Sequence, residues 1–345
     1  MAINAGLTQR LSPEESLTHG CWVKLICGAS NQDLPSITDL CAVYSMVGVH
    51  CIDVAANPAV VHAARLGLAW VEERSGYRPW LMVSLSDGLD VHFRKAWFDP
   101  THCPPECKRP CQHVCPAEAI AEWAAVDPQL CYGCGRCLPA CSYGLIKEQD
   151  YSFNLEAVGD LLVTLQPDAV EIHTAPDHDQ GFDVLMGSLD KVSLSLQRLA
   201  VSCGLERRGM GMVPERIATT LWRRHARLRH SGFRPLWQLD GKPMSGDIGA
   251  GTARSAVKLW RAMNSIAPPG PLQLAGGTNH HTLKHLDCQE RPAGIAFGGA
   301  ARRLLMPLLR EAQHRGISLR DWPEGWERAT TLAQVLVAPW INRSC

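Results

Sequence analysis

The chain has 345 residues, 46% of them hydrophobic and 20% charged, which is the composition of a folded globular protein rather than a disordered one. Its 34 basic and 34 acidic residues balance without long runs of either sign, so nothing favours nucleic acid or an anionic membrane as the main partner. No secretory signal pattern and no transmembrane-length apolar run is present. Together with 15 cysteines, this predicts a cytoplasmic protein whose reduced thiols are available to metals.

Short apolar runs alternate with amphipathic helical stretches along most of the chain. Ser36 is the expected N-cap of the first long helix, and Pro58 and Pro214 mark the starts of two others. The predicted strands are 22–27, 50–54, 80–85, 169–173, 199–203, 234–239, 271–275 and 293–297. The predicted helices are 36–47, 58–68, 153–165, 181–196, 214–229, 253–263 and 300–312.

Eight strands alternating with helices predict an α/β fold, a (β/α)8 TIM-like barrel. An open doubly wound sheet would show the same alternation, but the count of eight and the glycine pairs after the last two strands favour the barrel. We expect residues 1–85 and 151–315 to form the barrel and 316–345 to form a C-terminal tail packed on it. Residues 86–150 would be a ferredoxin-like insertion after the third strand, at the barrel face that usually carries function.

The predicted insertion holds eight cysteines in two runs. The second run, CYGCGRCLPAC (131–141), has the C-x2-C-x2-C-x3-C spacing of a [4Fe-4S] ferredoxin loop. The first, CPPECKRPCQHVC (103–115), is a widened version of it. Each last cysteine begins a similar segment, CPAEAI (115–120) and CSYGLI (141–146), as expected of a duplicated ferredoxin unit.

In two-cluster ferredoxins the fourth cysteine of each run ligates the other cluster. This rule predicts two [4Fe-4S] clusters, one held by the Cys131 group and one by the Cys103 group. The Cys131 group is Cys115, Cys131, Cys134 and Cys137; the Cys103 group is Cys103, Cys107, Cys111 and Cys141. The Cys131 group has the stronger support, because the other run is widened and Ser142 replaces the usual proline.

Other uses of these cysteines are weaker. Structural zinc rarely needs eight cysteines interleaved in this way. Disulfides would need an oxidising compartment. A radical S-adenosylmethionine motif, C-x3-C-x2-C, fails because position 110 is proline.

The glycine pairs after the last two strands indicate a phosphate site, because loops there often cradle phosphate with backbone N–H groups. A bound phosphate would make FMN a natural partner for the clusters, since flavins exchange electrons singly or in pairs. Tight βα turns explain the same glycines equally well. The candidate residues are Gly276, Gly277, Thr278, Asn279, Gly298 and Gly299.

Further polar residues fall near predicted strand ends, but no nucleophile–base pair can be placed, so no catalytic residue is predicted. Turn chemistry and solvated loops explain most of them. They are Asn31, Asp53, His173, Asp240, Lys242, His280 and His281. The cysteines outside the insertion fit core packing, although Cys27 and Cys203, at strand ends, could be redox-reactive thiols.

Three stretches resemble the light-dependent period protein family, LdpA, of cyanobacteria: residues 23–64, the cysteine block 103–142, and DGKPMSGDIGAGTA (240–253). The resemblance implies an iron–sulfur protein that senses redox state as a proxy for light and passes it to clock-input proteins. It also implies redox carriers of quinone or ferredoxin type as partners. It supplies no catalytic residues.

The leading hypothesis is therefore an iron–sulfur redox sensor or electron-transfer protein, not an enzyme. The alternative is an oxidoreductase whose clusters relay electrons to a flavin or substrate at the barrel mouth. A third possibility is that the clusters have a purely structural role and hold the long insertion together.

Overall fold

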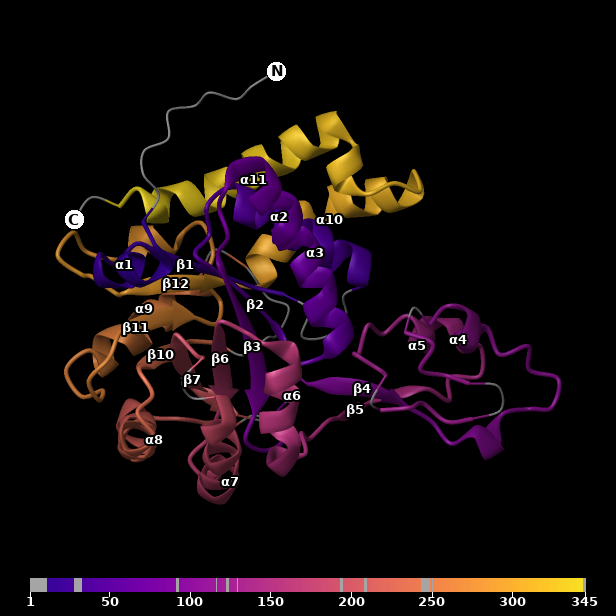
Figure 1. Cartoon of the computed structure of the whole chain (residues 1–345), viewed down its shortest axis with the longest axis horizontal. Coiled ribbons are helices and arrows are strands. Elements are labelled where there is room, and N and C mark those ends of the chain that lie inside the picture. The colour runs from indigo at the N-terminus through magenta and orange to yellow at the C-terminus, as the bar shows by residue number, and fades with distance from the viewer. Residues whose placement is uncertain are drawn as a thin grey trace.

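Eight parallel strands close into a barrel in this computed structural model (Figure 1). The structure describes residues 11–343 except 28–32, 91–92, 116, 122–123, 129, 193–194, 208–209, 243–248 and 250. The strands are β1 (Trp22–Ile26), β2 (Cys51–Ala55), β3 (Trp80–Ser86), β6 (Ala169–His173), β7 (Arg198–Gly204), β10 (Pro235–Asp240), β11 (Leu272–Ala275) and β12 (Gly294–Phe297). Their order around the barrel is β1-β12-β11-β10-β7-β6-β3-β2, which confirms the TIM-like prediction and excludes the open sheet.

Helices follow the strands and cover the outside of the barrel. Asp33, rather than Ser36, caps the first long helix: its Oδ1 accepts the N–H of Ser36 at 3.0 Å. The Ser36 prediction was wrong because Pro35 is tolerated in the first helical turn, so the helix begins two residues earlier. The outer helices are α2 (Leu34–Met46), α3 (Pro58–Ser75), α6 (Val158–Leu165), α7 (Asp179–Leu189), α8 (Pro214–His230), α9 (Ala253–Met263) and α10 (Gly299–His314).

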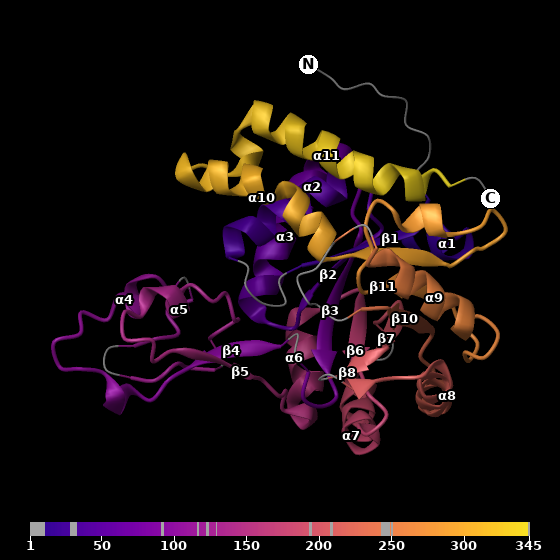
Figure 2. The same cartoon turned by 180° about the vertical axis from the view of Figure 1, so that it is seen from behind.

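Both ends of the chain form helices that close the barrel unit. Helix α1 (Pro13–Thr18) starts with a capping box between Ser12 and Glu15, and its Leu17 packs among apolar side chains at the N-terminal end of the barrel interior. Helix α11 (Pro323–Ile341) lies across α2 and α10, as both views show (Figures 1 and 2). No helix in the described ranges is both long enough and apolar enough to cross a membrane.

The insertion leaves the barrel after β3 and returns before α6, which confirms its predicted position. Strands β4 (Arg94–Trp97) and β5 (Lys147–Asp150) pair antiparallel and form its stem. Beyond the stem lie helices α4 (Pro110–His113) and α5 (Cys137–Ala140). Figure 2 shows this unit projecting from the side of the barrel. A small hairpin of β8 (Glu206–Arg207) and β9 (Met210–Gly211) follows β7.

Short 3-10 segments complete the connections. They are η1 (Pro100–His102), η2 (Leu155–Ala157), η3 (Asp190–Val192), η4 (Thr282–His285) and η5 (Leu319–Asp321).

Candidate iron–sulfur centre and barrel interior

The four thiols of the Cys103 group line one pocket of the insertion. It contains about 300 Å³ of empty space, including its opening to solvent. Cys141 follows α5, at the end of the second cysteine run, yet it faces the same space as three cysteines of the first run. The other lining residues are Phe98, Arg109, Pro110, Ser142, Tyr143, Leu145 and Ile146. The predicted crossover therefore corresponds to a real convergence of side chains.

Arg109 places a positive charge beside this pocket. Its φ of 51° lies in the left-handed region, directly before Pro110 starts α4. The buried guanidinium donates from Nη1 to Cys103 Sγ at 3.5 Å and from Nη2 to the Ala124 carbonyl at 2.8 Å. The guanidinium therefore holds a positive charge against the sulfur of a predicted cluster ligand.

The backbone around Cys141 favours the thiolate form of its side chain. Burial alone would raise the pKa of this thiol, but backbone N–H groups of residues 143–146 lower it below its ordinary value. Cys111 shows the opposite shift: burial raises its pKa, and the Cys141 and Cys103 thiols add to the rise. The influence of Cys141 and Cys103 on the pKa of Cys111 agrees with a shared pocket.

The Cys131 group forms around a loop with two left-handed glycines, Gly133 at φ 79° and Gly135 at φ 76°. Burial, followed by Cys134, Cys131 and Cys115, raises the pKa of Cys137 to about 12. Burial also raises the pKa of Cys134, and Cys115 and Cys131 add to the rise. Thiols that oppose one another's ionisation in this way lie close together, and cationic iron bound among them would remove the repulsion.

The donor set suits cubane clusters. Each group offers four thiols, and the Ala119 N–H donates to Cys115 Sγ at 3.3 Å, a type of contact that tunes cluster potential. Within the described parts of the chain, no three His, Cys, Asp or Glu side chains lie close enough to share a single metal ion. A cubane makes a different demand, because each of its four irons takes its own thiolate.

The Cys131 group is the one that contacts the barrel. Tyr132 belongs to the main hydrophobic core, and Cys134 packs against that core. Arg136, between Cys134 and Cys137, forms an ion pair with Asp33 at the N-terminus of α2. The Cys103 pocket is lined only by residues of the insertion.

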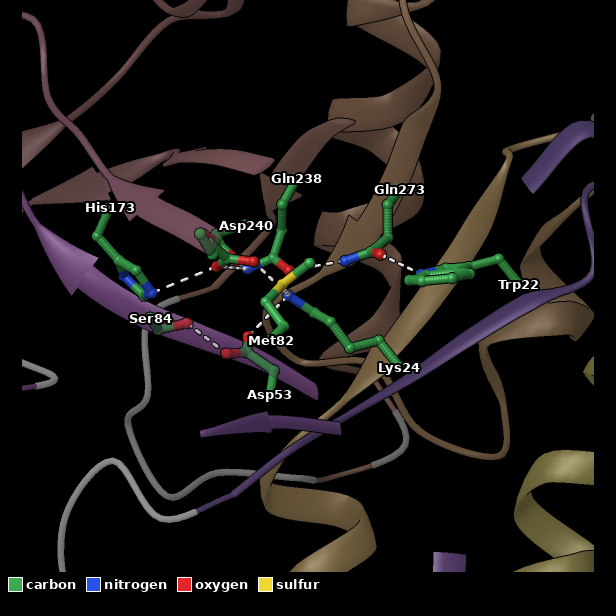
Figure 3. Close-up of polar contacts among 10 residues, drawn as sticks. Trp22, Lys24, Asp53, Met82, Ser84, His173, Gln238, Asp240 and Gln273 are labelled. Atoms are coloured by element: carbon green, nitrogen blue, oxygen red, sulfur yellow. Dashed lines mark hydrogen bonds and ion pairs between the residues drawn. The ribbon is translucent and has the colours of Figure 1, made fainter. Parts of the chain in front are cut away.

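A charged network fills the inside of the barrel (Figure 3). The fully buried Lys24 Nζ donates to Asp53 Oδ2 at 2.8 Å and to Glu171 Oε2. Strands β1 and β6 are not neighbours, so the Lys24–Glu171 bond crosses the interior. Ser84 Oγ donates to Asp53 Oδ1 at 2.5 Å. Every charge buried here has a partner, as such groups require.

Amides extend the network across the barrel. Gln238 Nε2 donates to Glu171 Oε1 at 2.8 Å, and Gln273 Nε2 donates to Gln238 Oε1 at 2.7 Å. The Trp22 indole N–H then donates to Gln273 Oε1 at 2.7 Å. At the C-terminal end of the barrel, His173 lies 3.3 Å from Glu171 and 3.5 Å from Asp90.

Ser202 points into the same interior, because it is the cross-strand partner of both His173 and Gln238. Its hydroxyl is buried and has no hydrogen-bond partner among the described residues.

The predicted phosphate-site glycines occupy two different settings. A Cβ at Gly276 would lie 2.5 Å from the Lys242 carbonyl, and one at Gly277 would lie 2.9 Å from that of Thr252, so these glycines permit close loop packing. Thr278 donates to the Ala296 carbonyl, and Asn279 Nδ2 donates to the Gly249 carbonyl at 3.1 Å. Gly298, by contrast, precedes α10, which begins at Gly299.

The remaining strand-end residues do not gather into one site. Asp53, His173 and Asp240 belong to the barrel network, whereas the His280 and His281 rings, tilted by 44° to each other, precede η4. The Lys242 N–H donates to the Gly276 carbonyl at 3.1 Å. Asn31 lies outside the described residues.

Comparison with known proteins places these features in a family. A family model for the LdpA Fe-S cluster-binding domain matches residues 103–152, and one for the Light dependent period A C-terminal domain matches 161–339. The protein Light dependent period A of Synechococcus elongatus is 46% identical over 336 residues, covering 95% of this chain and 93% of that protein. This chain belongs to the light dependent period A family.

Membership in the light dependent period A family confirms the resemblance seen in the sequence and identifies the insertion as an Fe-S cluster-binding domain. Among solved structures, the chain is similar to the carboxyl transferase domain of Rhizobium etli pyruvate carboxylase, with a TM-score of 0.46 and 10% identity over 95% of this chain and 50% of that one. It is also similar to a geranylgeranylglyceryl phosphate synthase of Thermoplasma acidophilum, with a TM-score of 0.42. The identity is 10%, and the match covers 95% of this chain and 99% of that one.

Sequence reasoning missed Lys24 and Glu171, the centre of the barrel network. Each is a lone acidic or basic residue within a largely apolar strand, at a position that faces the barrel interior. A charge at an inward position of an otherwise apolar barrel strand is the signal that would have indicated the network.

Proposed function

We propose that this protein is an iron–sulfur redox sensor that exchanges electrons through two [4Fe-4S] clusters, one held by the Cys131 group and one by the Cys103 group. When bound, the clusters would supply one-electron transfer. Because its relative is named Light dependent period A, the state of the clusters would report on light to clock-input partners. Thiolate ligation requires a reducing compartment, such as the cytoplasm.

The observation that carries this proposal is the pocket shared by Cys141 with Cys103, Cys107 and Cys111. A single-cluster site would have no reason to bring the last cysteine of one run among the first three of the other. The crossover of ligands is the property that distinguishes a two-cluster ferredoxin unit.

The chain's own residues would link cluster state to the barrel. The Cys131 group lies against the core through Tyr132, and Arg136 joins its loop to Asp33. A change of charge at the Cys131 group would act directly on Arg136, whose ion pair fixes the start of α2. The sensor would thereby transmit its state through the β1–α2 connection to the barrel surface.

Anaerobic purification with iron, sulfide and flavin quantified tests the proposal. We expect about eight irons and eight sulfides per chain, and an EPR signal that appears on reduction. Bound zinc in place of iron after careful reconstitution would refute the proposal.

A second candidate function is an oxidoreductase in which FMN or a substrate binds at the barrel mouth. Two observations favour it: the buried Ser202 hydroxyl inside the barrel, and the start of α10 at Gly299, where Gly298 has no side chain to cap the first N–H groups. Flavin released by denaturing the anaerobic protein would support this function, and its absence at full cluster loading would oppose it.

A further inference from the structure

Two buried cysteines outside the cluster domain touch each other. Cys27 Sγ and Cys41 Sγ lie 3.8 Å apart, and both residues are 0% exposed. Cys27 directly follows β1 at the C-terminal end of the barrel, and Cys41 is a buried residue of α2, one of the helices on the outside of the barrel. A disulfide has a sulfur separation of about 2.05 Å, so the two sulfur atoms would have to approach each other by less than about 2 Å.

Two other buried cysteines of the barrel lie in different surroundings. Cys51 lies in β2 beside the charged network. Burial raises the pKa of its thiol, Lys24 opposes the rise and Asp53 adds to it. Cys21 Sγ donates to the Ser16 carbonyl at 3.7 Å.

Cys27 and Cys41 lie on either side of the junction between β1 and the start of α2. A bond between Cys27 and Cys41 would close a ring that contains Asp33, the residue paired with Arg136. Arg136 lies between Cys134 and Cys137. The dithiol and the Cys131 group are therefore both connected to Asp33, the first along the chain and the second through Arg136.

We propose that Cys27 and Cys41 form a reversible disulfide, which makes the barrel itself a second redox-responsive site beside the cluster domain. With a peroxide as oxidant, one thiolate attacks the O–O bond, giving a sulfenic acid and releasing water after proton transfer. The second thiol displaces the hydroxyl, so that an S–S bond forms and a second water leaves. A dithiol reductant reverses the step by exchange, taking over the disulfide and returning both protons.

Burial shapes the kinetics of this site. Burial raises the pKa of Cys41 well above its ordinary value, and the adjacent Cys27 thiol contributes to the rise. Since the thiolate is the reactive form, this raised pKa slows the reaction of Cys41.

The experiment counts free thiols in one peptide. Trypsin cuts after Lys24 and Arg65, and the peptide 25–65 contains three cysteines, Cys27, Cys41 and Cys51. Anaerobic holoprotein is treated with graded hydrogen peroxide, acid-quenched, denatured, alkylated and digested for mass spectrometry. We expect the labels on this peptide to fall from three to one, with Cys51 still labelled, and dithiothreitol to restore three.

The exposed Cys288 serves as the dose control. Three labels on peptide 25–65 at a dose that fully oxidises Cys288 would overturn the proposal, and so would a bond that links Cys51. In Cys41→Ser we expect Cys27 to stop at sulfenic or sulfinic acid, whereas Cys51→Ser should still lose two labels. Iron and sulfide are measured on the same samples, so failure of the disulfide is distinguishable from failure of the proposed clusters.

Discussion

Arg136 of the cluster domain forms an ion pair with Asp33, the residue that caps helix α2 of the barrel. The bond joins a loop that carries two cluster-ligand candidates to the helix that follows the first barrel strand. It is the most direct polar link between the site proposed to change its redox state and the fold that would respond.

Removing this link should loosen the cluster loop. In Arg136→Ala we expect a stability loss of about 1 kcal/mol, because the pair is partly exposed. We also expect faster loss of iron from the Cys131 group under a chelator. Arg315→Ala, which breaks an exposed i,i+4 pair with Glu311 on α10, is the control. Equal iron release in both variants would contradict a role for Arg136 in holding the loop.

Lys24 should be essential to the barrel. Lys24→Met leaves Asp53 and Glu171 buried without their cation, which we expect to cost about 3–5 kcal/mol. The exposed Lys258→Met in α9 should change stability by less than about 0.5 kcal/mol. Urea unfolding followed by circular dichroism measures both. A loss below about 1 kcal/mol for Lys24→Met would show that the network does not depend on this charge.

Stability should fall at mildly alkaline pH because of His173. Burial opposes its protonation, but Asp90 and Glu171 raise its pKa well above the ordinary value. A group with a raised folded-state pKa contributes fully below its unfolded pKa of about 6.5, and the contribution is lost as pH rises toward the folded value. We expect His173→Gln to be less stable than wild type at pH 6 and to show a smaller decline above pH 7. Parallel pH profiles would contradict this assignment.

At low pH, Glu171 acts in the opposite direction. Burial disfavours its charge, but Lys24 and then His173 outweigh this and lower its pKa to about 2. Its contribution is present above the unfolded pKa of about 4.3 and is lost as pH falls toward 2. Glu171→Gln should therefore flatten the acid limb of the stability profile between about pH 4 and 2. If Glu171→Gln loses as much stability as wild type between about pH 4 and 2, other carboxylates cause that loss.

Gly67 should tolerate no side chain. A Cβ there would lie 2.4 Å from the Thr38 carbonyl and 3.0 Å from Cys41 Cβ, because α3 packs directly on α2. We expect Gly67→Ala to destabilise by about 1–3 kcal/mol through overpacking. Gly187→Ala in α7 meets no atom within 4 Å and should stabilise by about 0.5–1 kcal/mol. Thermal unfolding of the pair tests the close helix contact.

The barrel could be predicted because its strands are short apolar runs with β-branched residues, and alternation with helices leaves few topologies. The start of α2 could not be placed, since Asp33 and Ser36 are both good caps and only the path of the chain selects between them. The sequence indicates only a tail at residues 316–345, because the apolar face of helix α11 is defined by its packing on α2 and α10.

The cysteine groups were predictable because ferredoxin spacing encodes them directly. The Lys24–Asp53–Glu171 network was not, because its members lie on three strands and each looks like an isolated charge. The Cys27–Cys41 contact likewise depends on how α2 packs beside the end of β1. Such relationships arise from tertiary packing, which local sequence pattern does not contain.

The central claim, two clusters with exchanged ligands, is tested most directly by anaerobic iron and sulfide analysis of Cys141→Ala. The matched control is Cys288→Ala, which alters an exposed cysteine outside the insertion. Crossover predicts about eight irons in the control and about four in Cys141→Ala, with the EPR signal of the Cys131 group retained. Full iron content in Cys141→Ala, or loss of the Cys131-group signal with the Cys103-group signal retained, would contradict the account.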